Sequence, residues 1–427
     1  MWQGTGFDND MIIERPLYLK RLIALRHNGM IKIVTGIRRC GKSFLLSTLY
    51  AGWLRENGVA SDHIIDINLE DRRNKALRDP DNLLTYIDSQ IKDDEMHYIM
   101  IDEIQLVPEF EDVLNSYLNM PNADVYVTGS NARFLSSNVR TEFAGRGDEI
   151  RLHPLSFSEI NSVRGGDKIL NLREYMVYGG MPQVVLRTTE KEKSEVLKAL
   201  FQRTYIRDIV ERYNIKNIDV LDELLNIVAS SIGGLTNPTK LCNTFESVRH
   251  EKVNRMTVTS YLSYLCESFL IEKSSQYDIK GKRYIDSPYK YYFSDCGLRN
   301  ARLNFRQIEF THLLENVIYN ELLIRGFNVD VGVVPRQVRT NDGSRVRRNY
   351  EVDFVCNQGS RRYYIQSAYK MIDDEKVRQE ENSLRNIDDS FKKIIILGES
   401  TPVLRNEYGI TIISIYDFLL NENALEL

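Results

Sequence analysis

Eight residues near the N-terminus constrain the fold of this chain more than any other segment. They fit the pattern G-x-x-x-x-G-K-[ST] and run Gly36-Ile37-Arg38-Arg39-Cys40-Gly41-Lys42-Ser43. The apolar run 31–35 before them predicts a buried strand, and residues 44–50 after them predict a helix. The glycines allow backbone N–H groups to turn inward around a phosphate, and the helix N-terminus adds partial positive charge. The segment therefore predicts a phosphate-binding loop, because a chance match in a glycine-containing turn would not need both flanking patterns.

Each part of this loop has an expected task. Lys42 is long enough to reach the β- and γ-phosphates of a nucleoside triphosphate, and the Ser43 hydroxyl suits Mg²⁺. The nucleotide contacts are expected to run from Gly36 to Phe44. Lys42 is also a candidate catalytic residue.

The composition excludes several classes of protein. Net charge is −4, so any contact with nucleic acid would have to use local basic patches. The five cysteines are odd in number and free of CxxC spacing, which predicts a reducing compartment without structural zinc. The six histidines are isolated in the sequence and disfavour a histidine metal cluster. Without a signal segment or an apolar run of about 20 residues, the expected location is the cytoplasm, with no membrane partner.

Residues 28–155 alternate between strand and helix patterns. This alternation predicts an α/β fold with a parallel sheet, right-handed crossovers and helices on both faces. Ligands in such sheets lie at the carboxyl ends of the strands. The expected strands are 31–35, 64–69, 98–101, 124–128 and 149–152.

Two further strand ends carry candidate catalytic groups. Asp102 and Glu103 follow the third strand, where Asp102 can bind the Mg²⁺ shell and Glu103 can polarise the attacking water. Ser130 or Asn131, after the fourth strand, can orient water or touch the γ-phosphate. The alternatives are a solvated acidic strand end for the first pair and a turn with a helix cap for the second.

Arg146 is a candidate arginine finger, a residue that neutralises charge in the transition state of phosphoryl transfer. It can act within its own chain or on a neighbouring copy, and the spacing does not separate these two options. The alternative is an ordinary surface arginine.

Six segments together resemble a large family of prokaryotic AAA+-type ATPases, related to STAND and archaeal ATPases, with a C-terminal domain of unknown function. The segments are 35–43, 102–105, 128–130, 144–146, 154–157 and 178–182. The resemblance implies ATP as the nucleotide, an AAA+ core at residues 1–160 and a helical lid at 161–235. It also implies that Gly180 and Pro182 lie near the nucleotide. Cys40 departs from the serine more usual in the family, and a thiol beside the phosphates would make ATP turnover sensitive to oxidation.

Residues 236–304 are similar to the family's winged-helix segment. Such a unit can place its second helix in a DNA major groove and lay a basic two-stranded wing, here 271–293, along the phosphates. The alternative is a relay that packs on the nucleotide domain. The aromatic residues of the wing are expected to serve in packing.

Residues 305–427 resemble a restriction-endonuclease-like α/β domain, in which carboxylates hold Mg²⁺ and a lysine assists the chemistry. Glu315 on a helix and Asp353 on a strand match, and Gln366 replaces the second acid. Ala368 stands where the lysine is expected. Lys370, two residues further on, would face the same side by strand alternation and is a nearby substitute. The site is therefore expected to be a degenerate binding platform. A basic loop suits nucleic acid, or is simply solvated, and contains Arg336, Arg339, Arg345, Arg347 and Arg348.

The expected fold class is thus a P-loop α/β sheet with a helical lid, a winged-helix unit and a restriction-endonuclease-like domain. The expected function is Mg²⁺-dependent ATP hydrolysis that drives a conformational switch, with DNA as a candidate partner. Two alternatives stay open: an ATP-licensed nuclease, and a DNA-binding switch that holds nucleotide without turnover. Assembly into a homo-oligomer is also left open.

Overall fold

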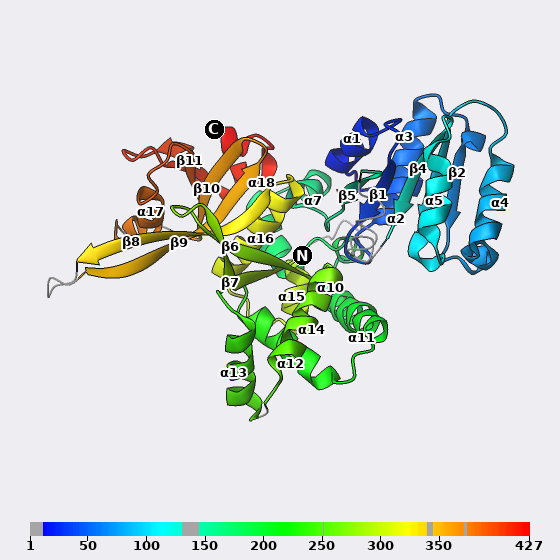
Figure 1. Ribbon diagram of the computed structural model, residues 1–427. Coiled ribbons are helices and arrows are strands. Elements are labelled where there is room, and N and C mark those ends of the chain that lie inside the picture. The colour runs from blue at the N-terminus through cyan, green and yellow to red at the C-terminus, as the bar shows by residue number, and fades with distance from the viewer. Residues whose placement is uncertain (1–11, 130–144, 251, 340–344, 371–373) are drawn as a thin grey trace. The chain divides into compact units, whose positions relative to one another are not determined.

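The computed structural model describes residues 12–129, 145–250, 252–339, 345–370 and 374–427 (Figure 1). They form two compact units. The N-terminal unit extends to Leu155 and includes the short stretch Glu267–Phe269. The C-terminal unit comprises Ser156–Cys266 and Leu270–Leu427. Among the described residues, no helix is both long enough and apolar enough to cross a lipid bilayer.

The N-terminal unit is built on a five-stranded sheet in which every pair of neighbours is parallel. Its strands are β1 (Ile31–Thr35), β2 (Ile64–Asn68), β3 (His97–Asp102), β4 (Ala123–Thr128) and β5 (Gly147–Arg151). They lie in the order β2-β3-β4-β1-β5, so β4 separates β1 from β3. The parallel sheet predicted from the alternating sequence pattern is confirmed.

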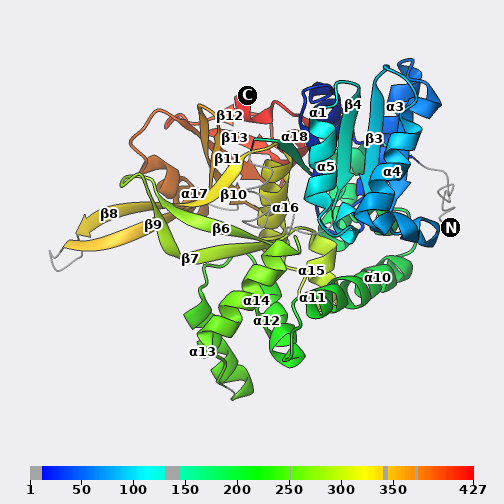
Figure 2. The same cartoon turned by 45° about the vertical axis from the view of Figure 1, so that its right-hand side comes forward.

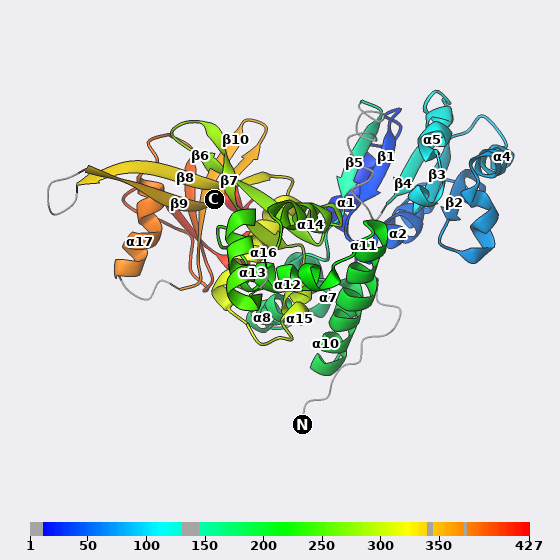
Figure 3. The same cartoon turned by 60° about the horizontal axis from the view of Figure 1, so that its bottom comes forward.

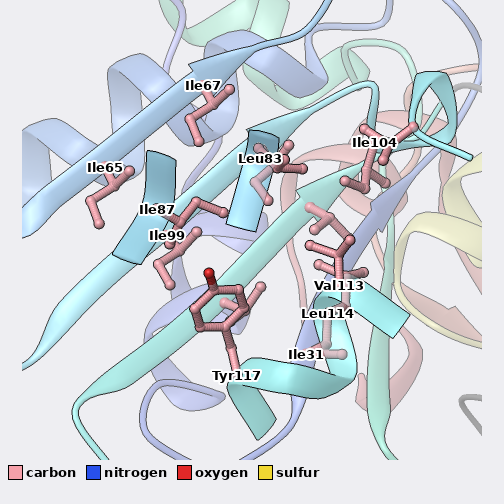
Figure 4. Packing of buried hydrophobic residues seen from close by; sticks show 14 of the residues in the cluster. Ile31, Ile65, Ile67, Leu83, Ile87, Ile99, Ile104, Val113, Leu114 and Tyr117 are labelled. Carbon is pink, nitrogen blue, oxygen red and sulfur yellow. The ribbon is translucent and has the colours of Figure 1, made fainter. Parts of the chain in front are cut away.

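Helices cover this sheet and bury its apolar strands. They are α1 (Pro16–Ala24), α2 (Lys42–Phe44), α3 (Ala51–Glu56), α4 (Pro80–Gln90) and α5 (Phe110–Leu118). A π-helical segment, Leu45–Tyr50, joins α2 to α3 without a break. Every residue of β1 and β3 is buried, as in strands covered on both faces. Figure 4 shows Leu83 and Ile87 of α4 and Tyr117 of α5 against isoleucines of β2 and β3, and Figure 2 shows α4 and α5 side by side.

The C-terminal unit begins with a run of helices. They are α7 (Phe157–Arg164), α8 (Lys168–Tyr178), α9 (Pro182–Val185), α10 (Glu190–Ala199), α11 (Arg207–Arg212), α12 (Ile218–Ser230), α13 (Pro238–Arg249) and α14 (Arg255–Glu267). Helix α15 (Cys296–Arg302) follows after two strands. The π-helical segment Leu200–Ile206 joins α10 and α11 into one continuous rod (Figure 3). The start of α7 is held by a capping box, in which Ser156 and Glu159 each accept a hydrogen bond from the other's backbone N–H.

An eight-stranded sheet completes the C-terminal unit. Its strands are β6 (Ile271–Asp278), β7 (Arg283–Phe293), β8 (Asn328–Arg339), β9 (Arg345–Gln358), β10 (Arg361–Ala368), β11 (Lys392–Leu397), β12 (Leu404–Arg405) and β13 (Thr411–Ser414). Their order is β12-β13-β11-β10-β9-β8-β6-β7. The accompanying helices are α16 (Phe310–Ile324), α17 (Asp374–Arg385) and α18 (Ile415–Leu420). The β8–β9 hairpin extends beyond the other strands (Figure 1).

This sheet differs from the expected division into separate domains at 236–304 and 305–427. The β6–β7 hairpin, expected to be the wing of a winged helix, pairs with the C-terminal strands, because β6 runs parallel to β8 from Gln276 to Asp278. Segments that are distant in the sequence thus share one sheet. The hairpin forms an edge of that sheet and belongs to the same compact unit.

The end of α8 packs tightly on the start of α15. Asp295 caps α15 by accepting a hydrogen bond from Leu298 N–H at 2.9 Å, and it also accepts one from Gly180 N–H at 2.6 Å. Asn300 Nδ2 donates to the carbonyls of Met176 and Val177. These contacts leave little space between the two backbones.

We expect Gly297→Ala to destabilise the protein. The added Cβ would lie 2.1 Å from the carbonyl oxygen of Tyr178, so backbone must move at a cost of about 1–3 kcal/mol. Gly52→Ala in α3 is the control, since its Cβ would meet nothing within 4 Å and removing a helical glycine should add roughly 0.5–1 kcal/mol. Urea unfolding followed by circular dichroism measures both. A Gly297→Ala protein as stable as the wild type would contradict this packing.

Candidate functional site

The phosphate-loop motif lies between the end of β1 and the start of α2. Gly36 has a φ of 141° and Gly41 a φ of 103°, both in the range that favours glycine. A Cβ on Gly36 would lie 2.1 Å from the carbonyl oxygen of Leu152, so the loop passes directly against the residue after β5. Lys42 Nζ lies 3.1 Å from Gly36 O and 3.3 Å from Ile37 O. The loop therefore wraps around the lysine ammonium.

Ser43 and Asp102 meet at this loop. The Ser43 hydroxyl lies 2.8 Å from Asp102 Oδ2 and 2.9 Å from Oδ1. Thr128 Oγ1 donates to Asp102 Oδ1 at 2.5 Å and accepts a hydrogen bond from Glu103 N–H at 2.9 Å. Asp102 and Glu103 are both buried. Because β4 lies between β3 and β1, the Thr128 hydroxyl at its end can hydrogen-bond to both Asp102 and Glu103.

Sequence reasoning missed Thr128. It looked beyond the strand end, to Ser130 and Asn131, which lie outside the described residues. The available signal was that Thr128 is a polar residue at the carboxyl end of β4. The strand order places β4 between the phosphate loop and the acid pair.

Glu103 adopts a left-handed conformation with a φ of 57°, which costs about 1–3 kcal/mol for a residue other than glycine. Its carboxylate accepts a hydrogen bond from Gln105 Nε2. Gln105 Oε1 is buried and has no hydrogen-bond partner among the residues that the structure describes. Two acceptor groups, one charged and one neutral, thus belong to the short turn that follows Asp102.

Arg146 lies at the opposite end of the sheet. Its carbonyl accepts a hydrogen bond from Ile31 N–H at 3.0 Å, at the start of β1, and its guanidinium contacts Asn115 Oδ1 at 3.5 Å. The phosphate loop follows the end of β1, about five residues and roughly 16 Å away. The option that Arg146 acts within its own chain is therefore wrong. Action on a neighbouring copy stays a prediction.

The hypothesis that the Cys40 thiol makes ATP turnover sensitive to oxidation is not supported. The thiol is fully buried, and its Sγ lies 3.6 Å from the carbonyl oxygen of Leu152. Burial raises the pKa of the thiol, although the nearby charges of Lys42 and Arg15 act in the opposite direction. The side chain therefore packs against the residue after β5, and the thiolate needed for reaction is disfavoured.

Arg15 is a second residue that sequence reasoning missed. It is buried before α1, where it donates to Cys40 O at 3.3 Å and to His153 O at 2.8 Å. It thereby links the phosphate loop to the chain after β5. These partners lie 25 and 138 residues away, so no local pattern could have indicated the contact.

Of the remaining predicted loop residues, Ile37 is buried and the other three are more exposed. Arg38 pairs with Glu70 at 2.9 Å, Arg39 has a φ of 68°, and the ring of Phe44 is 40% exposed. Gly180 and Pro182 belong to the C-terminal unit, where Gly180 N–H binds Asp295 and Pro182 begins α9. Their expected place beside the nucleotide stays a prediction.

A second group of predicted residues comes together in the C-terminal unit. Asp353 Oδ2 on β9 accepts hydrogen bonds from Ser367 N–H and Oγ–H, both at 2.8 Å, on β10. The Gln366 side chain lies 3.4 Å from Asp353 N. Lys370 does not join them: it pairs with Glu399 at 3.3 Å, and both side chains are half exposed. The suggestion that Lys370 replaces the missing lysine is wrong, because β10 ends at Ala368 and strand alternation ends with it.

The lysine that reaches this group is Lys290 of β7. Its Nζ lies 2.8 Å from Glu315 Oε1, 2.7 Å from Glu351 Oε1 and 3.7 Å from Asp353 Oδ1. Tyr292 Oη also donates to Glu315 Oε1, at 2.7 Å. We call Lys290, Glu315, Glu351 and Asp353 the lysine–carboxylate cluster.

Burial governs the charges of this cluster. Burial raises the pKa of Glu315 to about 7, although Lys290 acts in the opposite direction. Burial alone would lower the pKa of Lys290, but the three carboxylates raise it above its ordinary value. The lysine is 2% exposed, so the cluster is a buried cation surrounded by its own counter-ions.

Comparison with known proteins identifies relatives over nearly the whole chain. A family model described as "AAA domain" matches residues 28–161, and one described as "Domain of unknown function (DUF8612)" matches 169–309. An uncharacterized protein of Haemophilus influenzae is 33% identical over 415 residues, which cover 96% of this chain and 99% of the relative. An uncharacterized protein of Methanocaldococcus jannaschii is 29% identical over 396 residues, 89% of this chain and 84% of the relative.

Solved structures resemble the chain only distantly. The Aeropyrum pernix Orc1 protein in complex with DNA has a TM-score of 0.32 and 11% identity. The similarity covers 69% of this chain and 94% of that one. At this TM-score the likeness carries no functional argument.

We expect Lys290→Met to destabilise the protein by about 3–5 kcal/mol, because it leaves buried carboxylates without their cation. The loss should grow with pH. Burial already gives folded Glu315 a pKa of about 7, above that of an unfolded glutamate, so its protonated form favours folding and its ionised form opposes it. Without the lysine, the deficit should be smallest near pH 5 and increase as the pH rises through 7.

Chemical unfolding at several pH values measures this effect. Lys282→Met, at an exposed position in the β6–β7 turn, is the matched control and should change stability little. Glu315→Gln combined with Lys290→Met should restore part of the loss. Equal deficits at pH 5 and pH 8 would show that Lys290 contributes packing and no compensating charge.

Proposed function

Because the chain belongs to the family of AAA-domain proteins that includes the Haemophilus influenzae relative, we propose that it hydrolyses ATP with Mg²⁺ to drive a conformational switch. One observation carries the proposal above the others. The Ser43 hydroxyl and the Asp102 carboxylate, from elements separated by β4, meet at 2.8–2.9 Å beside the phosphate loop.

The oxygen atoms at this point fit a magnesium ion. Mg²⁺ prefers oxygen donors and commonly takes one or two protein oxygens together with phosphate and water oxygens. Ser43 Oγ and Asp102 would hold it, and Thr128 fixes the orientation of the Asp102 carboxylate. When bound, Mg²⁺ neutralises charge on the phosphate oxygens.

The phosphate loop would hold the triphosphate itself. Its glycines bring the backbone close, and the Lys42 ammonium lies in its centre, within 3.3 Å of two loop carbonyls. A polyphosphate can offer this ammonium stronger acceptors than neutral carbonyls. Lys42 would thus move from the loop backbone onto the β- and γ-phosphates.

The carboxylate of Glu103 is the candidate group that polarises the attacking water. Gln105 Oε1, a buried acceptor without a partner among the described residues, lies on the same short turn. An acceptor of this kind suits the second proton of that water. We therefore add Gln105 as a positioning residue, because it would orient the water while Glu103 accepts the proton.

The lysine–carboxylate cluster favours a non-nucleolytic role for the C-terminal unit. We interpret its segment α16-β8-β9-β10-α17-β11 as a degenerate restriction-endonuclease-like core. Glu315 Oε1 is shared by Lys290 and Tyr292, and Asp353 Oδ2 by two groups of Ser367, so few carboxylate oxygens are left for a metal. A binding platform that responds to the nucleotide is the better proposal.

DNA is the partner that the charge of this platform favours. Arg345, Arg347 and Arg348 lie exposed along β9, on the hairpin that extends from the sheet. Arg336 and Gln337 of β8 stand opposite Arg348 and Arg347. Consecutive strand residues point to opposite faces, so the hairpin presents exposed arginines on both faces. Guanidinium groups suit backbone phosphates and would give binding without sequence preference.

Phosphate release tests the hydrolysis proposal. Lys42→Ala should abolish Mg²⁺-dependent release and ATP binding, because the ammonium at the centre of the loop is gone. Glu103→Gln should lower turnover by about 10²–10⁴ while ATP still binds, since only the base is removed. Asp353→Asn, in the other unit, is the control and should leave turnover unchanged.

Two results would contradict this proposal. If calorimetry of the wild-type chain detects no ATP binding, the phosphate loop has another role. If ATP binds tightly but no phosphate is released, the protein is a switch that holds nucleotide without hydrolysis.

Salt dependence tests the DNA partner. Replacing Arg345, Arg347 and Arg348 by Gln should weaken binding to duplex DNA of any sequence. The slope of log affinity against log salt should fall by roughly 0.9 for each phosphate that an arginine no longer neutralises. Lys252→Gln, exposed in the segment between α13 and α14, is a single control that removes a positive charge elsewhere. An unchanged slope in the triple variant would exclude the hairpin as the surface that binds DNA.

A further inference from the structure

Two histidines that are far apart in the sequence lie together at the start of the N-terminal sheet. β2 and β3 pair in parallel with Ile64 opposite Tyr98, so His63 stands opposite His97, the first residue of β3. The two ring centroids are 4.6 Å apart and the rings are nearly perpendicular, at 80°. The expectation of isolated histidines is wrong for this pair, because parallel neighbours are separated in sequence by a whole crossover.

A carboxylate completes the group. Asp93 lies in the segment between α4 and β3, and both of its oxygens are 3.1 Å from His63 Nε2. One ligand atom from each of His63, Asp93 and His97 lies within 4.8 Å of the other two. Donors that bind one zinc ion at about 2.0–2.1 Å lie roughly 3.3 Å apart in tetrahedral geometry. The His63–Asp93 spacing already matches, and the partly exposed side chains of His63 and Asp93 would close the remaining distance to His97.

The hydrogen bonds around His97 prepare it as a ligand. Its ring is fully buried, and Nδ1 lies 2.8 Å from the carbonyl oxygen of Glu95, which can only accept. Nδ1 therefore carries the proton, and Nε2 carries the lone pair, whose present hydrogen-bond donor is a backbone N–H. Lys92 N–H approaches this Nε2 at a long 3.4 Å. A backbone carbonyl behind the ring is the usual arrangement for a metal-binding histidine.

The segment that carries Asp93 is also held in place. Glu95 N–H donates to Asp93 Oδ1 at 2.9 Å, and Asn122 Nδ2 donates to the Asp93 carbonyl at 2.9 Å. Asp93 Oδ2 keeps its other lone pair. The Asp93 side chain is 49% exposed, so an ion and a water ligand can reach the group from solvent.

We propose that His63, Asp93 and His97 bind a transition-metal ion of the zinc class. Two imidazole nitrogens and one carboxylate favour Zn²⁺, Co²⁺ or Ni²⁺ over Mg²⁺, which prefers oxygen donors. The ion would fasten the starts of β2 and β3 to the segment before β3. His97 begins the strand that Asp102 ends, so this site lies roughly 16 Å along β3 from the phosphate loop and is separate from it.

Zinc titration of the full-length chain tests the proposal. The protein is prepared without a histidine tag, stripped with a chelator and titrated calorimetrically. We expect one high-affinity Zn²⁺ per chain, a higher unfolding temperature with Zn²⁺, and no such effect with Mg²⁺. Co²⁺ in place of Zn²⁺ should give the visible absorption of a low-symmetry nitrogen–oxygen site.

Substitutions assign the site. His63→Gln and Asp93→Asn should each weaken Zn²⁺ binding at least about tenfold, since even changing a group that only hydrogen-bonds to a metal ligand costs about 10–100-fold. Both positions are partly exposed, which avoids the folding risk of changing buried His97. His312→Gln, at a half-exposed histidine beside Glu309, is the matched control and should bind as the wild type does.

Two outcomes would overturn the proposal. The first is no stoichiometric Zn²⁺ binding by the wild type. In that case the three residues only hydrogen-bond and pack with one another. The second is binding that survives in His63→Gln and Asp93→Asn, which would place the metal elsewhere. Lys42→Ala should retain Zn²⁺, so a failure of the ATPase proposal leaves this test intact.

Discussion

The contact between the Ser43 hydroxyl and the Asp102 carboxylate organises the N-terminal unit. It joins the helix after β1 to the tip of β3, across the end of β4, and Thr128 holds the carboxylate in place. The contact depends on the strand order β3-β4-β1, which places the ends of β1 and β3 on either side of β4. Burial of β1 and β3 along their whole length holds these strand ends in position. Arg15 braces the same loop from the N-terminal side. The contacts of Thr128 and Arg15 therefore help to fix the positions of the Ser43 hydroxyl and the Asp102 carboxylate.

In the C-terminal unit, buried charged side chains join elements that are distant in the sequence. Its long sheet joins segments that the sequence separates, and polar contacts specify how they meet. Asp295 holds the α8 and α15 backbones together through two N–H groups, and burial raises the pKa of its carboxyl to about 6. Lys290 holds the edge strand β7 against α16 and β9. Each of these buried charges is compensated by a specific partner, as the low dielectric of an interior requires.

Much of the N-terminal unit could be predicted because its signals are local. The phosphate-loop pattern, the apolar strands and the acidic strand tip each occupy a few consecutive residues, so the parallel sheet followed directly from them. The errors concern contacts between distant segments. Lys290 looked like one more basic residue of a wing, because only the β6–β8 pairing carries it to Glu315 and Asp353. Arg146 looked like a finger, because spacing does not reveal that it borders the start of β1.

Lys290 differs from a metal ion in that its positive charge cannot dissociate from the protein. A divalent cation among three carboxylates exchanges with solution, so its occupancy follows the free concentration of that ion. An ammonium carried on β7 is covalently attached and cannot be drawn away by a chelator or by scarcity. The carboxylates of α16 and β9 therefore keep their neutralising partner as long as the protein is folded, whatever the free concentration of divalent cations.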